Sequence, residues 1–171
     1  MIAVLVGERV ATTTPMVTRT AADSRQTSPA YGLRVVLPAH HRQIEYACVG
    51  LMAAAMLNDR RVIGQAFREL EYELLEHLTA EEELMFPAYE LSEPAEAHQL
   101  RADHARLREL LASVAVAIEL QAIHLDDLQA LVDLLRSHAQ REDASMYRWA
   151  QHHLSVLERK EVFGRIRHWR R

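Results

Sequence analysis

Four long segments of this chain carry apolar residues at intervals of three and four positions, the periodicity of amphipathic helices. The predicted helices cover residues 38–57, 60–86, 92–122 and 124 or 126 to 152. Because the turns between them are short, consecutive helices must run antiparallel. The pattern predicts an all-α fold, an up-down-up-down four-helix bundle, with a short C-terminal helix after it.

Residue types that favour helix ends support these boundaries. Pro38 and Pro94 fall in first turns, where a missing backbone N–H costs little. Ser92 is the expected N-cap of the third helix, and Asn58 and Asp59 end the first. The helix ends therefore agree with the apolar periodicity.

The 171 residues are about enough for one domain. Residues 1–34 are rich in Thr, Ser and Pro and show no periodicity, which predicts a disordered or loosely packed N-terminal arm. Residues 35–171 would form the bundle and its basic C-terminal helix.

Composition excludes several classes of protein. A single cysteine, Cys48, excludes an intramolecular disulfide framework and a cysteine-rich metal site. The net charge of −4 is unlike a strongly basic nucleic-acid-binding domain. No apolar run approaches the ~18 residues of a membrane span, and the first residues lack the features of a secretory signal. We expect a cytoplasmic protein with no nucleic-acid partner and no membrane span.

Polar residues interrupt the predicted buried faces in a regular way. A lone histidine on such a face is usually a hydrogen-bonded core residue, whereas an unpaired buried glutamate is costly or becomes protonated. Each stripe contains one histidine, and two also contain a glutamate one turn further on: His41, His77 with Glu81, His104, and His138 with Glu142. Because residues four apart lie one above the other on a helix, the two pairs and two further histidines indicate a shared cation.

The four histidines also lie at similar heights along the predicted bundle. His41 and His77 are each 18 residues from the turn at residue 59. His104 and His138 are 19 and 15 residues from a turn near residue 123. At a rise of about 1.5 Å per residue, each pair meets within about one helical turn. The six candidate ligands therefore converge on one layer.

The second half of the chain repeats the first. Residues 138–147 align with residues 77–86 at an offset of 61, and His104 aligns with His41 at an offset of 63. Such a repeat supplies equivalent half-sites for two metal ions. Imidazole and carboxylate ligands suit iron, or manganese, better than tetrahedral structural zinc. The order His-x-x-x-Glu differs from the Glu-x-x-His of ferritin-like bundles.

This series of histidines and glutamates resembles the hemerythrin-like (HHE cation-binding) domain family over about residues 36–152. The resemblance implies a hemerythrin-like four-helix bundle that holds a non-haem, oxo- or hydroxo-bridged di-iron centre. It also implies a role for each of the six residues. The terminal ligands would be His41, His77, His104 and His138, and the bridging ligands Glu81 and Glu142.

The sequence departs from the oxygen-carrying hemerythrins of invertebrates, which have a His-x-x-x-His pair on the third helix. Leu100 and Arg108 flank His104 here, and Glu142 follows His138 by four residues rather than five. Six protein ligands would leave an open position on each iron. The resemblance then favours a centre that reacts with or senses a small ligand over simple oxygen carriage.

The expected function is that of a non-haem di-iron protein that binds or reacts with O₂, hydrogen peroxide or nitric oxide. An enzyme of this kind would be a di-iron oxidoreductase acting on peroxide or nitric oxide. The alternatives are an iron- or oxygen-responsive sensor or interaction module, and an iron-binding or storage protein without turnover.

Several assignments stay open from the residues alone. The apolar stripe favours His41 over His40 as the inward residue, and Glu45 is either a further ligand or a surface ion-pair partner. Glu82 and Asp143 follow the two candidate bridging glutamates and would orient imidazole N–H groups or face solvent.

Five aromatic residues could relay electrons to iron, but aromatic packing explains them with fewer assumptions: Tyr46, Tyr72, Tyr89, Tyr147 and Trp149. The basic C-terminal helix either caps the bundle or contacts a membrane surface, an acidic protein partner or a second copy in a homodimer.

Overall fold

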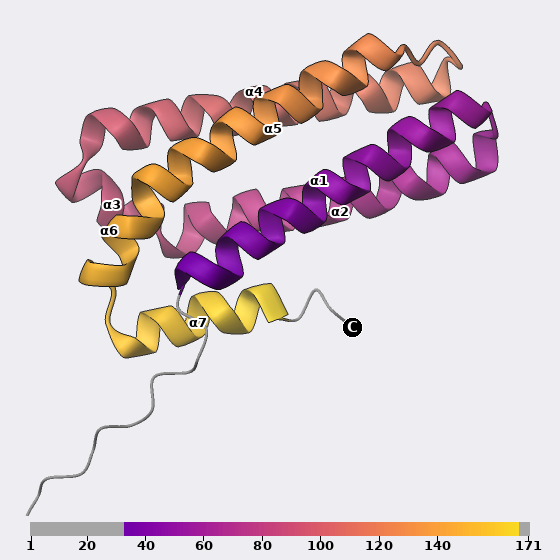
Figure 1. Ribbon diagram of the computed structural model, residues 1–171. Helices are drawn as coiled ribbons and strands as arrows, with labels where there is room; N and C mark the ends of the chain where they lie inside the picture. The colour runs from indigo at the N-terminus through magenta and orange to yellow at the C-terminus, as the bar shows by residue number, and fades with distance from the viewer. Residues whose placement is uncertain (1–32, 168–171) are drawn as a thin grey trace, which may run out of the picture.

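The computed structural model describes residues 33–167, and the described chain is helical with no strand. The helices are α1 (Leu33–Leu57), α2 (Arg60–Leu84), α3 (Phe86–Ser92), α4 (Pro94–Glu119), α5 (Leu125–Ala144), α6 (Met146–His153) and α7 (Val156–Arg167). Figure 1 shows α1 with α2 and α4 with α5 as two long hairpins, with the short helices gathered at one end. The predicted all-α bundle is confirmed.

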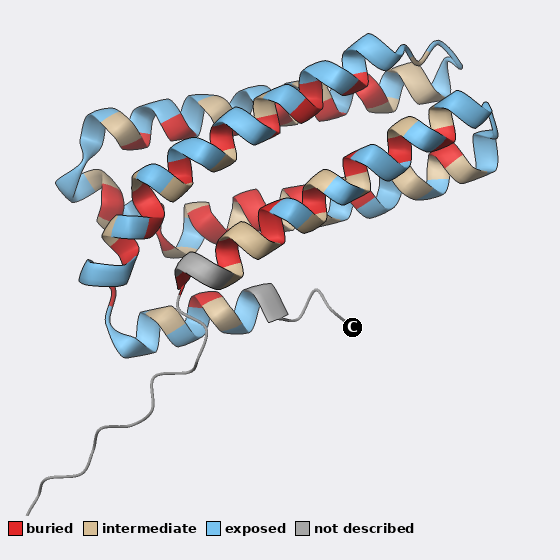
Figure 2. Ribbon diagram, in the orientation of Figure 1, coloured by how far each residue is buried: buried red, intermediate tan, exposed pale blue. Residues whose placement is uncertain are grey.

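The four long helices form a closed bundle, because each packs against two others: α1 against α2 and α5, and α4 against α5 and α2. Figure 2 shows the buried residues on the faces that these helices turn toward one another. No helix in the described part of the chain is both long and apolar enough to cross a membrane. The predicted arm lies outside the described residues except for its last two positions, which α1 includes.

The connection between α1 and α2 follows from two polar residues. Asn58 adopts a positive φ of 53°, which asparagine tolerates better than most residues. The Asp59 side chain accepts hydrogen bonds from the backbone N–H groups of Arg61 at 2.9 Å and Val62 at 3.2 Å. This N-cap satisfies two of the unpaired donors at the start of α2.

The start of α1 differs from the prediction. The helix begins at Leu33, five residues before the expected start, and Pro38 lies inside it. Leu33 and Leu37 are both buried against residues from the far end of the chain. Their packing outweighs the one backbone hydrogen bond that Pro38 cannot donate.

Two of the predicted helices are broken in the structure. The helix expected over residues 60–86 ends at Leu84, and the one expected to reach residue 152 ends at Ala144 and resumes as α6. Consecutive Met and aromatic residues follow each break, and all four are fully buried: Met85, Phe86, Met146 and Tyr147. Each break therefore lies at residues that are buried in the apolar cluster beside the short helices.

Ser92 is not the N-cap of the third long helix. It is the last residue of α3, and its hydroxyl donates a hydrogen bond to the Tyr89 carbonyl at 3.2 Å. The helix α4 begins at Pro94, with Glu93 as N-cap and no side-chain capping bond. The short helix α3 therefore fills the connection between α2 and α4, and Ser92 ends a helix rather than begins one.

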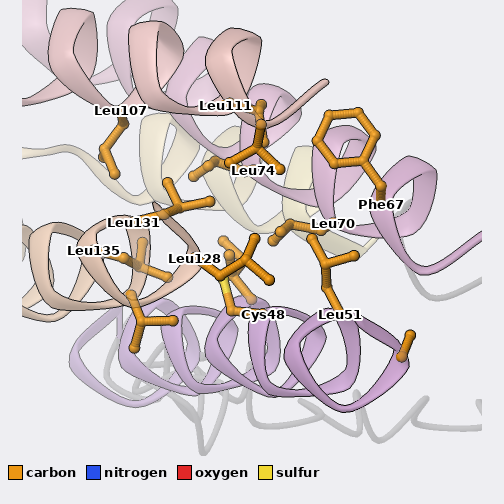
Figure 3. Close-up of a cluster of buried hydrophobic side chains, with 14 of the residues drawn as sticks. Cys48, Leu51, Phe67, Leu70, Leu74, Leu107, Leu111, Leu128, Leu131 and Leu135 are labelled. Atoms are coloured by element: carbon orange, nitrogen blue, oxygen red, sulfur yellow. The ribbon is translucent and has the colours of Figure 1, made fainter. Parts of the chain in front are cut away.

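The core consists of two apolar clusters. The loop-end cluster lies toward the α1–α2 and α4–α5 connections and includes Leu51, Leu74, Leu107 and Leu135 (Figure 3). The cap-end cluster lies toward the short helices: Leu33, Leu37, Ala80, Met85, Phe86, Tyr89, Ala97, Leu100, Met146, Tyr147, Ala150, Leu154 and Val162. Along the chain, each candidate histidine lies between a residue of one cluster and a residue of the other.

The C-terminal helix α7 packs beside α2 and α1 at the cap end. Val162 is buried there, and Arg165 Nη2 lies 3.3 Å from Glu83 Oε2 on α2. This arrangement agrees with a helix that caps the bundle. A homodimer or other protein partner at this helix stays a prediction.

Candidate metal centre

Six polar side chains form a single buried layer between the two apolar clusters. They come from all four long helices: His41 of α1, His77 and Glu81 of α2, His104 of α4, and His138 and Glu142 of α5. The most exposed of them, His41, is 5% exposed, and His77, His138 and Glu142 are 0% exposed. The structure thus brings together all six residues predicted from the stripes, and we call them the polar layer.

The donor atoms of the polar layer form two overlapping groups. One contains His41, His77, His138 and Glu142, and the other contains Glu81, His104, His138 and Glu142. Within each group, one donor atom per residue lies within 4.8 Å of all the others. The helix periodicity produces this convergence, because His–Glu pairs four residues apart share one face of α2 and of α5.

Several donor atoms of the layer are buried without a hydrogen-bond partner, namely Glu81 Oε2, His104 Nε2, His138 Nε2 and Glu142 Oε1. Such atoms in a protein interior require an explanation. His104 Nε2 lies 3.5 Å from Glu81 Oε2 and 3.5 Å from Glu142 Oε1, and His138 Nε2 lies 3.2 Å from Glu142 Oε1.

These spacings fit donors around an ion. Donor atoms about 2.1 Å from one ion lie about 3.0 Å apart at right angles and about 3.4 Å apart at tetrahedral angles. Nitrogen and carboxylate oxygen donors, without any thiolate, also suit first-row transition metals. The residues present therefore fit a metal centre.

Charges inside the layer are arranged to attract a cation. Burial lowers the pKa of His104, but the carboxylates of Glu142 and Glu81 outweigh burial and raise it to about 11. Burial also lowers the pKa of His138, and Glu142 above all raises it to about 9. Burial and the charge of Glu142 raise the pKa of Glu81 to about 6. The two carboxylates thus favour positive charge beside them, whether on protons or on a metal ion.

Outer carboxylates lie beside two of the imidazoles, and one of them is hydrogen-bonded to its ring. His104 Nδ1 lies 2.9 Å from Glu82 Oε1, and the Arg108 guanidinium holds the same carboxylate with two hydrogen bonds of 2.7 and 2.9 Å. The suggestion that Glu82 orients an imidazole is confirmed. Asp103 Oδ2 lies 3.8 Å from His138 Nδ1 and was missed, although it precedes His104 in the sequence. Such partners fix the ring orientation and tautomer of ligating histidines.

Both histidines of the pair on α1 are buried, with different surroundings. His41 Nε2 lies in the polar layer, 3.0 Å from Glu142 Oε2 and 2.8 Å from His77 Nε2. His40 lies behind His77, with the two Nδ1 atoms 3.1 Å apart, and its Nε2 is 3.2 Å from Glu73 Oε2. The structure therefore puts His41 in the candidate centre and His40 beside it.

Tyr147 belongs to the layer although it was interpreted as a packing residue. Its hydroxyl hydrogen-bonds to Glu81 Oε1 and, at 3.0 Å, to Glu142 Oε2, and it lies 3.2 Å from His41 Nε2. The sequence did contain a signal, because the repeat aligns Tyr147 with Phe86 and so exchanges an apolar ring for one with a polar atom.

Other candidates lie outside the layer. Glu45 pairs with Arg136 near the surface, where Arg136 Nε donates to Glu45 Oε1 at 2.8 Å. Leu100, four residues before His104, is fully buried in the cap-end cluster. Four further histidines are exposed: His98, His124, His152 and His153.

A buried set of imidazoles and carboxylates in the middle of an antiparallel helical bundle defines a metal-binding helical protein. The sequence profile of the hemerythrin HHE cation binding domain matches residues 33–150. The chain therefore belongs to the hemerythrin HHE cation-binding family. Comparison with curated proteins and with solved structures gave no match.

Proposed function

We propose that this protein is a non-haem di-iron protein that binds or reacts with O₂, hydrogen peroxide or nitric oxide. The six residues of the polar layer would be the ligands, with His41, His77, His104 and His138 as terminal donors and Glu81 and Glu142 as bridges. Family membership supports cation binding, and the donor set supports iron.

The observation that carries the proposal is the orientation of the two carboxylates. Glu142 turns Oε2 toward His41, at 3.0 Å, and Oε1 toward His138, at 3.2 Å. Glu81 turns Oε2 toward the Nε2 atoms of His77 and His104, each at 3.5 Å, and Oε1 toward Tyr147. Each carboxylate therefore offers its two oxygens to different neighbours, as a ligand shared by two ions does.

The chain's own residues would prepare and protect the centre. The apolar clusters on both sides of the layer exclude bulk water, so only small ligands fit beside the buried donors. Glu82 and Asp103 face the outer nitrogens of His104 and His138 and hold the rings toward the layer. Bound iron would supply electron transfer to or from O₂, peroxide or nitric oxide.

The proposal is tested by anaerobic loading with Fe(II), followed by metal analysis and X-ray absorption spectroscopy. We expect about two iron ions per chain, with nitrogen and oxygen neighbours and an iron–iron scattering contribution. His104→Ala should lose iron, whereas His98→Ala, which removes an exposed histidine of the same helix, should not. Iron bound as single, separate ions would contradict a di-iron centre.

Turnover assays separate the alternatives for function. Repeated consumption of hydrogen peroxide or nitric oxide by the iron-loaded protein supports an oxidoreductase. A single stoichiometric change of the iron, without turnover, supports a sensor or storage role instead.

A further inference from the structure

The polar layer has two halves that the internal repeat relates, one with His41 and His77 and the other with His104 and His138. The two halves differ at one aromatic ring. Phe86 and Tyr147 each follow a helix break, five residues after Glu81 and Glu142, and both are fully buried. The Phe86 ring lies 5.0 Å from that of His104, centroid to centroid. The Tyr147 ring stacks at 5.5 Å and 18° on its counterpart, His41. Each half thus has an aromatic ring against one histidine, and only one of these rings carries an oxygen.

The hydroxyl oxygen of Tyr147 points toward the polar layer. Tyr147 Oη lies 3.0 Å from Glu142 Oε2 and 3.2 Å from His41 Nε2, and it contacts Glu81 Oε1. A phenol has one proton and so cannot donate to all three atoms. These spacings are as short as or shorter than those among the donors of the other half, which lie 3.2–3.5 Å apart.

Contact with solvent does not account for the presence of a hydroxyl at this position. Tyr147 is 0% exposed, and its nearest polar neighbours are candidate metal ligands. The equivalent position is filled by Phe86, which is fully buried and has no hydroxyl, so packing alone does not require a hydroxyl there.

We propose that Tyr147 is a further metal ligand, whose phenolate oxygen binds the ion held by His41 and His77. The proposal rests on the metal centre proposed above. As the ion binds, the O–H bond breaks, an oxygen–metal bond forms, and the proton is released to solvent with no change in oxidation state.

The two halves of the centre are then unequal. The half with His41 and His77 has one more protein oxygen than the half with His104 and His138. The open position for a small ligand therefore lies on the His104 side, where Phe86 supplies no donor.

Resonance Raman spectroscopy of the iron-loaded, air-oxidised protein tests this ligand directly. We expect a visible phenolate-to-iron(III) charge-transfer band and enhanced tyrosinate ring modes that shift when the protein contains ring-deuterated tyrosine. Tyr147→Phe should lose the band and the ring modes while it keeps bound iron. Tyr89→Phe removes another buried tyrosine hydroxyl, outside the polar layer, and should keep both.

Three results would overturn the proposal. Bound iron without tyrosinate modes in the unaltered protein would overturn Tyr147 as a ligand and leave the di-iron proposal intact. Modes that persist in Tyr147→Phe would do the same. A protein that binds no iron would overturn both proposals.

A second variant keeps the test decisive if Tyr147→Phe fails to fold. Phe86→Tyr puts a hydroxyl at the repeat-related position beside His104. Stronger tyrosinate modes in this variant support the proposal, because the repeat then supplies two phenols. An unchanged spectrum with iron bound would show that the positions of Phe86 and Tyr147 are not equivalent. The proposal rests on that equivalence.

Discussion

The loop-end cluster and the polar layer are carried by the same four helices at neighbouring positions, yet burial has opposite consequences in them. Leu74 and Leu107 of the cluster are fully buried, and removal of their apolar surface from water stabilises the fold. His77 and Glu142 of the layer are equally buried, but burial of polar or charged groups costs free energy unless they are paired. The apolar cluster therefore stabilises the bundle, whereas the polar layer is the candidate metal centre. Packing in the cluster holds the side chains of the layer in place.

The largest effect is expected from Glu142→Gln, which removes the charge of a carboxylate that faces both groups of imidazoles. Loss of a ligand should weaken iron binding more than loss of an outer partner does, by over about 100-fold. Competition with a chelator of known affinity measures the change. The matched control is Glu45→Gln, which alters an ion pair between α1 and α5 outside the layer and should leave affinity unchanged. Equal affinities in the two variants would mean that the layer is not the binding site.

A change in the cluster should act on stability instead. Leu74→Ala leaves a cavity in the loop-end cluster and should lower the free energy of unfolding by about 2–5 kcal/mol. Urea denaturation should give the same loss for metal-free and iron-loaded protein. A loss that appears only in the loaded protein would show that the cluster and the layer are not separate.

Removal of the metal also tests the comparison between the apolar clusters and the polar layer. A ligand that binds only the folded state at 100 times its dissociation constant adds about 2.7 kcal/mol to stability. Chelator-treated protein should therefore melt at a lower temperature and keep its helical circular dichroism, since the apolar clusters remain. Complete loss of helix on chelation would show instead that the metal, and not the clusters, holds the bundle together.

The smallest effect is expected from Glu82→Ala, which removes the acceptor at His104 Nδ1. Iron affinity should fall by about 10–100-fold, as for other partners of ligating histidines. The control is Glu83→Ala, which breaks an exposed pair with Arg165 and should not change affinity. An equal loss in both variants would point to a general effect of surface charge.

The effect of Glu82→Ala on stability should also depend on pH, and its sign can be worked out. Hydrogen bonds from His104 and Arg108 outweigh burial and hold the pKa of Glu82 at about 2, below its ordinary value of 4.5. Its contribution to stability is therefore present above pH 4.5 and is lost as the pH falls toward 2. Metal-free Glu82→Ala should differ most from the unaltered protein above pH 4.5 and least near pH 2. A difference that grows on acidification would contradict this assignment.

Much of the architecture could be predicted from the sequence because helical periodicity is a local property. The stripes located four long helices, and the position of each histidine on its stripe predicted one polar layer. The helix breaks at Met85 and Ser145 could not be predicted in this way. They coincide with residues that are buried in the cap-end cluster against other helices.

The sequence alone determined the fold class, the family resemblance and five residues of the polar layer, and it favoured His41 over His40 as the sixth. Each of these depends on residue types at fixed spacing along one helix. Only the tertiary structure decided that His41 enters the layer, that Asp103 faces His138, and that the Tyr147 hydroxyl meets the carboxylates. Tyr147 and His41 are 106 residues apart in the chain, so their contact depends on how α6 packs against α1. The local pattern puts a side chain on the inner face of its helix, and the packing of helices decides which atoms it meets there.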